Sequence, residues 1–438
     1  MRLRNILLIV FCLVIVIWGL VLYVTILQSS PKITNVFVNG SILVLLAFLA
    51  LLIFRYFALM YFSYVQHIEH QADLVPYLQD PYLPPVSVLI PAYNEGKVIA
   101  NSIRSVMALN YPKFEIIVID DGSTDETYAE AKQFEGQSGH CRVQVLTQTN
   151  QGKAAALNHG IQEASHPFIL CIDGDSRLDP DSLFFAVQHM RRPEVSAVAG
   201  NVKVVNRNNT LTMLQSLEYI EGLNMVRRGQ SWFHAVNIIP GPFGLFRKRV
   251  LRLVGGYDSD TFAEDCDLTV KILAHRGRIE YEPLSVSWTE APEHVRDFMR
   301  QRYRWTRGIL QSLRKHRAYM FSTQSGWVNT LVLWYMTFEA ILWPIMNIFA
   351  HIFFLFVVLF YGLVRVVLLW WGQLTLLDMM AALYCVGLEE EDLKHVPYAL
   401  IYRMFFVLFT DVCKMLASFE EMLGIEMTWG KLERKGRI

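Results

Sequence analysis

The sequence predicts an α/β domain with a mainly parallel sheet, inserted between two groups of membrane helices. The chain has 438 residues, of which 18% are charged, below the roughly 25% of soluble domains. Of the 40 basic and 40 acidic residues, 57 lie between residues 67 and 326. Long apolar stretches flank that block, and inside it short β-branched segments alternate with helical ones, which is typical of βαβ units.

We therefore divide the chain into three parts. Residues 1–66 form two membrane helices, 67–326 a cytoplasmic domain ending in amphipathic interface helices, and 327–438 a bundle of three or four spans with a basic tail. The middle part holds 28 basic and 29 acidic residues, so bulk charge does not favour nucleic acid as a partner. Six scattered cysteines without a CxxC motif are expected to be reduced packing residues.

The first apolar stretch, Asn5–Leu27, is 23 residues without a charge and can cross a hydrocarbon core of about 30 Å. The alternative, a cleaved signal peptide, requires a shorter apolar run and an Ala-x-Ala site, and here a second run, Val36–Val65, follows at once. Arg2 and Arg4 precede the first span, so the positive-inside rule places the N-terminus in the cytoplasm.

The C-terminal part predicts an antiparallel pair of spans and one further span. These are Trp327–Phe349, His351–Trp371 and Val396–Leu423. Leu374–Leu388 is only 15 residues and ambiguous. If it crosses, the acidic loop 389–392 faces outward, the basic tail 431–437 faces inward, and the spans number six, as the charge rule favours. If it is re-entrant, they number five.

The α/β block contains four short apolar, β-branched runs, each followed by a polar turn. We predict strands at Val86–Ile90, Glu115–Ile119, Arg142–Leu146 and Phe168–Ile172, and helices at Lys97–Leu109, Asp125–Phe134 and Lys153–Ala164. Ligands of parallel sheets bind beyond the carboxyl ends of the strands. The GxGxxG fingerprint is absent and Gly152-Lys153 lacks the earlier glycine of a phosphate loop, which excludes dehydrogenase and NTPase classes.

Two acidic motifs follow predicted strands. Asp173-Gly174-Asp175 can present carboxylate oxygens to a hard cation, although a simple Asx turn is the alternative. In the motif 120–126, Ser123 and Glu126 fit a capping box for the next helix. The doubled aspartate before Ser123 is not needed for that cap, and we assign it to ligand contact.

Two further motifs lie later in the block. Ala263-Glu264-Asp265 opens a helical stretch, so its acids either serve a site or only favour the helix N-terminus. Phe298–Tyr319 is expected to be a basic amphipathic helix on anionic lipid. Within it, Gln301, Arg304 and Trp305 share one face and combine an amide, a phosphate-binding guanidinium and an indole suited to a sugar ring.

The motifs, in this order between membrane spans, resemble those of the processive family 2 glycosyltransferases, the bacterial synthases of cellulose, hyaluronan and poly-β-1,6-N-acetylglucosamine. They are Tyr93-Asn94-Glu95, Asp120-Asp121-Gly122, Asn150-Gln151-Gly152-Lys153, Asp173-Gly174-Asp175, Glu264-Asp265 and Gln301-Arg302-Tyr303-Arg304-Trp305. The resemblance covers about residues 84–320.

Within this family, Gly200-Asn201-Val202-Lys203-Val204 and Thr289-Glu290-Ala291-Pro292-Glu293 look most similar to the poly-N-acetylglucosamine synthases. Two positions depart from the family pattern. Ala263 stands where many members have Thr, and residues 240–244 replace a Cys-Gly-Ser type of loop, which weakens a cellulose assignment.

The resemblance implies a GT-A fold, a UDP-sugar donor and Mg²⁺ or Mn²⁺ as cofactor. Asp265 would be the catalytic base, and Asp173 and Asp175 the metal ligands. The implied donor-binding residues are Tyr93, Glu95, Asp120, Asp121, Lys153, Asp173 and Arg304. The implied acceptor-binding residues are Glu264, Gln301 and Trp305. Arg302 would support its helix or face lipid headgroups.

The implied function is a multi-pass enzyme of the bacterial inner membrane that polymerises a UDP-sugar, in particular UDP-N-acetylglucosamine, into a β-linked exopolysaccharide of the kind found in biofilms. Its partners would be the growing polysaccharide, the lipid bilayer and small membrane or periplasmic export subunits. The alternatives are another β-glycan synthase, hyaluronan-like or glucan, a transferase of one sugar to a lipid carrier, and, from another class, a transporter with a sensor domain.

Glu339 lies near the middle of its predicted span, with Pro344 shortly after it. A carboxylate at that depth costs about 2.5–3.5 kcal/mol on insertion scales, so it should face the interior of the bundle. We hypothesise that Glu339 lines a route for the growing chain; the alternative is a protonated or hydrogen-bonded packing residue.

Overall fold

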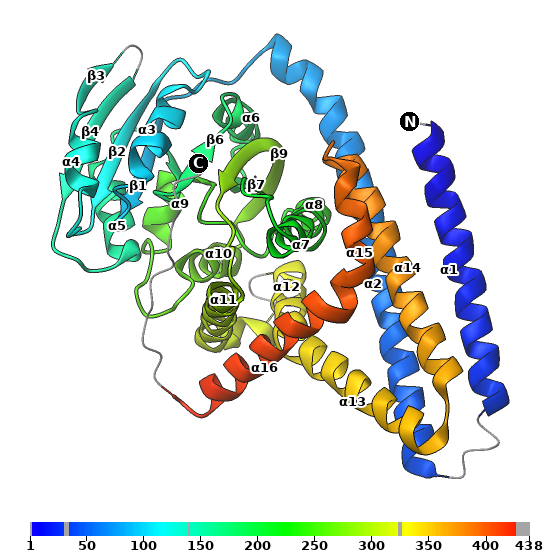
Figure 1. Ribbon diagram of the computed structural model, residues 1–438. Helices are drawn as coiled ribbons and strands as arrows, with labels where there is room; N and C mark the ends of the chain where they lie inside the picture. Colours follow the sequence, from blue (N-terminus) through cyan, green and yellow to red (C-terminus); the bar gives the residue numbers. More distant parts are fainter. Residues whose placement is uncertain (1, 30–34, 139–140, 323–325, 426–438) are drawn as a thin grey trace.

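The computed structural model describes residues 2–29, 35–138, 141–322 and 326–425, and it joins an α/β domain to a bundle of long helices (Figure 1). The basic tail 431–437, expected on the cytoplasmic side, lies outside the described residues. The five cysteines whose side chains are described are free and buried, as predicted.

The α/β domain is built on one nine-stranded sheet with the order β3-β4-β2-β1-β5-β8-β7-β9-β6. Its strands are β1 Val86–Ala92, β2 Phe114–Asp120, β3 Gly136–Ser138, β4 Cys141–Thr147, β5 Phe168–Cys171, β6 Ser176–Leu178, β7 Val195–Val204, β8 Gly244–Arg247 and β9 Arg278–Thr289. The four predicted strands are β1, β2, β4 and β5. They pair in parallel as β4-β2-β1-β5, so their carboxyl ends meet at one edge.

The rest of the sheet was not predicted. Strand β8 pairs antiparallel with both β5 and β7, while β7 and β9 run parallel to each other. Antiparallel β3 and β6 close the two ends of the sheet. The sheet is therefore mixed and mostly parallel, as the predicted fold class requires.

Helices cover both faces of the sheet, because alternate residues of each strand point to opposite sides. On one face, Val86, Val88 and Ile90 of β1 pack with the helices α3, α4 and α6. On the other face, Leu89 packs with α5, α9 and α10. These helices are α3 Ile99–Met107, α4 Thr127–Lys132, α5 Lys153–Glu163, α6 Ser182–His189, α9 Lys248–Leu253 and α10 Glu264–Ala274.

The remaining helices connect the domain to the bundle or form the bundle. They are α1 Arg2–Ser29, α2 Val36–Gln79, α7 Thr210–Glu218, α8 Met225–Ser231, α11 Val295–Lys315, α12 Trp327–Thr337, α13 Trp343–Tyr361, α14 Val364–Leu388, α15 Ala399–Ile401 and α16 Leu408–Met422. Among the described residues, three helical stretches are long and apolar enough to cross a membrane: Val36–Gln79, Trp327–Tyr361 and Val364–Leu388.

The predicted boundaries of the C-terminal segments were wrong. Helices α12 and α13 form one continuous stretch through a π-helical turn at Phe338–Leu342, and the chain reverses at Gly362, which has a left-handed φ of 65°. Helix α14 then runs back without a break to Leu388. Because apolar composition alone does not show where a helix turns, three expected segments in 327–388 are in fact two antiparallel helices (Figure 1).

We had expected the acidic loop after α14 to face away from the α/β domain. Instead, the loop is bound to the domain. Arg228 donates to Glu389 over 2.8 Å, and Arg207 donates to Glu391 over 2.6 Å. Lys203 at the end of β7 also lies 3.0 Å from Glu391. These ion pairs fix the loop to the domain, so both ends of the hairpin formed by α12–α13 and α14 lie on the domain side of the bundle.

Helix α2 continues from the bundle into the α/β domain. At 44 residues it is about 66 Å long, well beyond the thickness of a hydrocarbon core. Near its domain end, the buried His70 lies 2.8 Å from the carboxylate of Glu282 on β9. The same carboxylate lies 2.8 Å from His189 of α6, so one acidic group ties three elements together.

A buried ion pair ties the last helices to the bundle. Arg403 donates to both oxygens of Asp378 on α14, over 2.8 and 2.5 Å. The hydroxyl of Tyr56 on α2 donates to the same carboxylate over 2.6 Å. All three side chains are buried, so these contacts replace the water that each polar group loses.

Glu339 is held by a second polar contact of the bundle. Its carboxylate forms an ion pair with Arg55 of α2 and accepts a hydrogen bond of 2.7 Å from Tyr335. The guanidinium of Arg55 also lies 5.0 Å from the ring of Trp343. Glu339 therefore faces a neighbouring helix, as a carboxylate at this depth should.

We predict that Asp378→Leu lowers stability by about 3–5 kcal/mol, because Arg403 is left buried without its carboxylate. The double variant Asp378→Leu/Arg403→Met should recover most of this loss. Thermal unfolding of the full chain in detergent measures both. As a matched control, Asp80→Leu breaks an exposed ion pair with Arg191 and should change stability by about 1 kcal/mol at most. Equal losses at positions 378 and 80 would contradict the prediction.

Candidate active site

Hydrogen bonds connect the loop that follows β1 to the loop that follows β2. The backbone N–H of Asn94 donates to the hydroxyl of Ser123 over 2.9 Å, and that of Thr124 donates to the side chain of Asn94 over 2.8 Å. The predicted capping box of Ser123 and Glu126 was wrong. Helix α4 begins at Thr127, whose N–H donates to Asp125 over 3.0 Å, and Ser123 serves the neighbouring loop instead.

Tyr93 and Glu95 flank Asn94 in the first of these loops. The ring of Tyr93 is exposed, at the carboxyl end of β1. The N–H of Glu95 donates to the hydroxyl of Thr127 over 2.7 Å. Both residues lie at the sheet edge that the sequence predicted, and their contact with a donor stays a prediction.

The doubled aspartate at the end of β2 holds the next loop in place. Asp121 accepts hydrogen bonds from Gln148 over 2.8 Å, from the N–H of Gln151 over 3.0 Å and from the N–H of Gly152 over 2.8 Å. Asp120 accepts from the hydroxyl of Thr147 over 3.1 Å. Both carboxylates are buried and shape the turn that leads into Lys153, so a direct ligand contact stays a prediction.

The turn after β5 carries Asp173 and Asp175 on either side of a glycine. A Cβ on Gly174 would lie 2.9 Å from the carbonyl oxygen of Pro91, so the turn packs directly on the end of β1. Asp175 is buried. Asp173 is partly exposed and points to the start of α5, where it meets Lys153.

The ammonium group of Lys153 lies at the centre of the site. It is 2.7 Å from Asp173 and 2.7 Å from Glu264, which opens α10. One cation therefore joins the end of β5 to the start of α10, two segments that are far apart in the sequence. The neighbouring Asp265 lines the same cavity, together with Leu157, Cys171, Ile172, Gly241 and Tyr257.

Gly241 is a residue of this site that the sequence analysis did not identify. A Cβ at this position would lie 2.9 Å from the Lys153 nitrogen and 3.1 Å from each oxygen of Asp173. Its backbone N–H also donates to Asp265 over 3.3 Å. The signal was present in the Pro-Gly-Pro run 240–242, because a glycine between two prolines marks a backbone that approaches something closely.

The pKa values of the two carboxylates at the start of α10 are shifted in opposite directions. Burial raises the pKa of Asp265 to about 6, and the negative charge of Glu264 adds to this effect. Burial alone would also raise the pKa of Glu264, but the contact with Lys153 holds it below its ordinary value. Burial likewise opposes the charge of Lys153, yet the three nearby carboxylates keep its pKa well above the usual range.

Two adjacent carboxylates with pKa values pushed apart are typical of acid–base chemistry. Glu264 stays ionised as the partner of Lys153, whereas Asp265 changes protonation near neutral pH. Asp265 is therefore the residue of this cavity best suited to accept a proton.

Helix α11 brings the charge of Arg304 within electrostatic reach of Glu264. The positive charge of Arg304 is among the influences that lower the pKa of Glu264. Four residues further along, Gly308 packs directly on Ala263, because a Cβ on Gly308 would lie 2.4 Å from the Ala263 Cβ. The face of α11 that carries Arg304 thus lies against the turn that leads into Glu264 and Asp265.

The other residues of the predicted helix face are packed within the protein. Gln301 is buried and accepts a hydrogen bond of 3.1 Å from Arg302. Trp305 is half-buried beside Val202 and Val204 of β7, and the guanidinium of Arg302 lies 4.2 Å from its ring. Contact of Gln301 and Trp305 with an acceptor stays a prediction.

The expectation that α11 lies with its basic residues on lipid was wrong for Arg307 and Lys315, whereas Arg302 takes one of the two roles that the resemblance implied for it. Arg302 is buried in an ion pair with Glu218 of α7, so it supports the helix. Arg307 donates to Glu421 over 2.7 Å, and Lys315 binds a group of aspartates. These basic groups hold α11 to neighbouring elements of the protein.

The donor set at the end of β5 fits Mg²⁺ or Mn²⁺. Hard divalent cations prefer carboxylate oxygens, and Asp173 and Asp175 supply them from one short turn. Asp173 already holds a positive group, the ammonium of Lys153, beside the cavity that Glu264 and Asp265 line. The residues present are therefore suited to a divalent cation.

Comparison with known proteins agrees with this geometry. The sequence model described as "Glycosyl transferase family 2" matches residues 87–255. The chain is 36% identical over 224 residues to a poly-beta-1,6-N-acetyl-D-glucosamine synthase of Staphylococcus epidermidis, which covers 51% of this chain and 54% of the relative. It is 34% identical over 249 residues to the synthase of the same name from Staphylococcus aureus (strain COL), which covers 57% and 60%. The chain thus matches little more than half the length of these curated relatives.

Among solved structures, the chain is similar to the mannosyltransferase PcManGT from Pyrobaculum calidifontis in complex with GDP-Man and Mn²⁺. The TM-score is 0.60 at 20% identity, over 84% of this chain and all of the other. At that identity the likeness concerns the fold alone, and it confirms the expected GT-A fold. On this fold, residues 87–255 match the sequence model of glycosyltransferase family 2.

Proposed function

We propose that this chain is a membrane-embedded, processive, inverting glycosyltransferase that polymerises UDP-N-acetylglucosamine into a β-linked polysaccharide and helps to export it. The observation that carries this proposal is the cavity in which Lys153 bridges Asp173 and Glu264 beside Asp265. The relatives named poly-beta-1,6-N-acetyl-D-glucosamine synthase support the choice of sugar.

The reaction would be one displacement at the anomeric carbon. Asp265 takes the proton of an acceptor hydroxyl while that oxygen forms a bond to the anomeric carbon. The bond from this carbon to the diphosphate breaks on the opposite side, and UDP leaves with the electron pair. The configuration inverts, so an α-linked donor gives a β-linked product. Lys153 and Arg304 place positive charge where negative charge develops.

The donor would lie across the carboxyl ends of β1, β2 and β5. Tyr93 would stack on the uracil ring, with Glu95, Asp120 and Asp121 around the nucleoside. Asp173 and Asp175 would hold Mg²⁺ or Mn²⁺, which when bound supplies positive charge to the diphosphate. The turn shaped by Asp121 sets the position of Lys153, so Asp121 acts on the donor site even through the backbone alone.

The acceptor would lie on the α11 side of the cavity. There Trp305 offers a flat ring for a sugar, and Gln301 and Glu264 offer hydrogen-bonding groups. For export, Glu339, which is paired with Arg55 near Trp343, would line the route of the growing chain through the bundle. With the N-terminus in the cytoplasm, the α/β domain would face the cytoplasm and the polymer would leave on the other side.

The proposal predicts that the full chain in liposomes, given Mg²⁺ or Mn²⁺, converts UDP-N-acetylglucosamine into a long polymer that a β-1,6-specific hydrolase degrades. The product is followed by radiolabel and sized by gel electrophoresis. A panel of other UDP-sugars serves as control. Turnover of UDP-glucose or UDP-glucuronate instead would favour another β-glycan synthase, and a lipid carrying one sugar would exclude processivity.

We predict that Asp265→Asn lowers kcat by about 10²- to 10⁴-fold, the usual contribution of a general base. Binding of UDP, measured by calorimetry, should stay within about twofold, since the asparagine keeps the shape of the side chain. A matched control is Asp80→Asn, which makes the same change at an exposed carboxylate that is paired with Arg191 and does not line the cavity. Full activity of Asp265→Asn would exclude Asp265 as the base.

The pH dependence of kcat/KM follows from the raised pKa of Asp265. A base works only when deprotonated, so activity should be constant well above pH 6 and fall about tenfold per unit below it. An ordinary surface aspartate would titrate roughly two units lower. A pH profile recorded at saturating Mg²⁺ tests this, and a profile that stays flat down to pH 4.5 would contradict it.

A further inference from the structure

One face of helix α11 lies along the segment 258–264, which leads into the two carboxylates of the cavity. The residues of this face are Arg304, Gly308, Gln311 and Lys315, spaced by four, three and four positions, so they share one side of the helix. Their contacts follow the segment in reverse order. Arg304 influences Glu264, Gly308 packs on Ala263, Gln311 accepts from the N–H of Phe262 over 3.0 Å, and Lys315 binds the far end.

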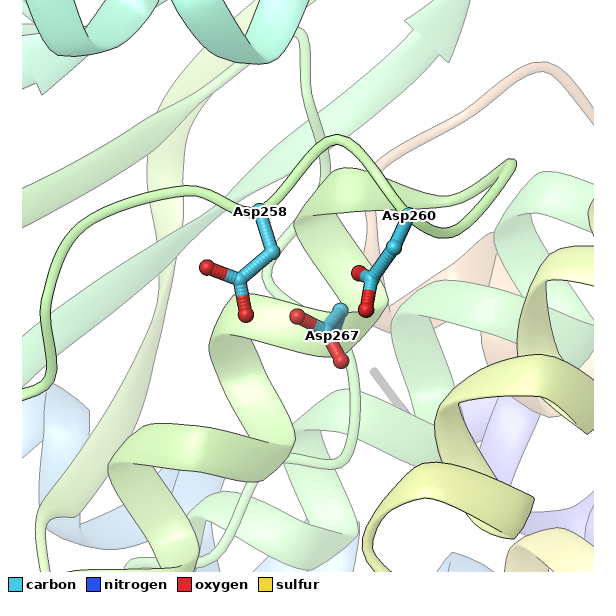
Figure 2. Close-up of side chains that lie close together, drawn as sticks. All are labelled: Asp258, Asp260 and Asp267. Atoms are coloured by element: carbon cyan, nitrogen blue, oxygen red, sulfur yellow. The ribbon is translucent and has the colours of Figure 1, made fainter.

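Lys315 binds three aspartates at once. Its ammonium lies 2.6 Å from Asp258, 2.7 Å from Asp260 and 3.1 Å from Asp267. Figure 2 shows the three carboxylates turned toward one another, two from the loop and one from α10. Asp267 is fully buried and also lies 2.8 Å from His316, the residue directly after α11.

Three carboxylates this close resemble a site for a metal ion. In the part of the chain that the structure describes, their oxygens lie within 4.8 Å of one another. The Lys315 ammonium is bound to all three, and Lys271 lies 3.0 Å from Asp258. The aspartates thus already have their counter-charges, and a cation site does not account for the group.

The end of the segment that Lys315 holds is also fixed to α5, through Tyr257, which directly precedes Asp258. Asn158 accepts from the N–H of Tyr257 over 2.9 Å and donates to its carbonyl oxygen over 2.8 Å. Helix α5 begins with Lys153, so this end moves with the donor side of the cavity. Just before it, Gly255 and Gly256 have positive φ values of 82° and 74°. The segment therefore bridges α5 and α11, and Lys315 is its charged anchor on α11.

We propose that Lys315 is a positioning residue for the transfer reaction, and this inference rests on the proposed function. By holding Asp258, Asp260 and Asp267, it fixes the start of α10 against α11. Glu264 and Asp265 are thereby kept at a set distance from Arg304 and Trp305. Lys315 touches neither donor nor acceptor, so it acts through the segment that it holds.

The geometry explains why this anchor affects acceptor use more than donor binding. The donor side is held by Lys153, Asp173 and Asn158, none of which contacts Lys315. Loss of the anchor loosens Asp265 relative to the acceptor helix, and displacement of a reacting group by about 1 Å can cost roughly 100-fold in rate. Water can then compete with the acceptor hydroxyl.

The test compares Lys315→Met with Arg314→Met in the full chain. Arg314 is the exposed neighbour on the same helix end, so the control removes the same charge without touching the aspartates. In Lys315→Met, backbone hydrogen exchange of residues 257–267 should rise, and kcat for polymer should fall roughly 10- to 100-fold. The KM for UDP-N-acetylglucosamine should change less than about twofold, and the share of donor that is hydrolysed should increase. Lys315→Arg should restore much of kcat.

The outcomes separate this inference from the proposed function. If exchange rises in Lys315→Met while kcat and the hydrolysed share stay unchanged, Lys315 only stabilises the fold and the inference is overturned. Unchanged exchange overturns it as well. If the wild-type chain makes no polymer and releases no UDP, the proposed function fails, and the inference that rests on it fails with it, whatever the exchange data show.

Discussion

The contact on which the site depends is the ammonium of Lys153 between Asp173 and Glu264. Without it, the carboxylates of Asp173, Glu264 and Asp265 would lie close together without this counter-charge, and their mutual repulsion would push the end of β5 away from the start of α10. Gly241 allows this arrangement because any side chain there would press on the lysine and on Asp173. The carboxyl end of the sheet and the α10 turn are thus joined by charge, and Asp265 lies next to this contact.

Much of the donor side of the fold could be predicted from the sequence. Strands β1, β2 and β5 are almost entirely buried, and β4 alternates buried with more exposed residues, so all four show strand patterns between polar turns. Strands β7, β8 and β9 could not be found in this way. Strand β9 buries Glu280 and Glu282 against histidines that come from distant parts of the chain, which breaks its apolar pattern. The contact between Lys153 and Glu264 could not be predicted either, because the two residues are far apart in the sequence and meet only in the folded chain.

In the bundle, the errors came from the use of composition to place boundaries. Helices α12 and α13 contain polar residues such as Asn347 and His351 that resemble a break, yet Asn347 donates to Asp411 over 2.7 Å inside the bundle. The true reversal at Gly362 had a local signal, a glycine that can adopt a positive φ. The acidic loop was placed by charge alone, whereas its position is decided by Arg228, Arg207 and Lys203, which no local pattern connects to it.

Helix α2 has a consequence for how the α/β domain is placed relative to the helical bundle. It runs unbroken from the bundle to Gln79, and His70 locks it to β9 through Glu282. Because the connection is a continuous helix and not a flexible linker, it sets both the distance and the orientation of the domain relative to the bundle. One residue added between the bundle and His70 would lift the domain by about 1.5 Å and swing it by about 100°. The length of this stretch is thus as strictly constrained as the chemistry it supports.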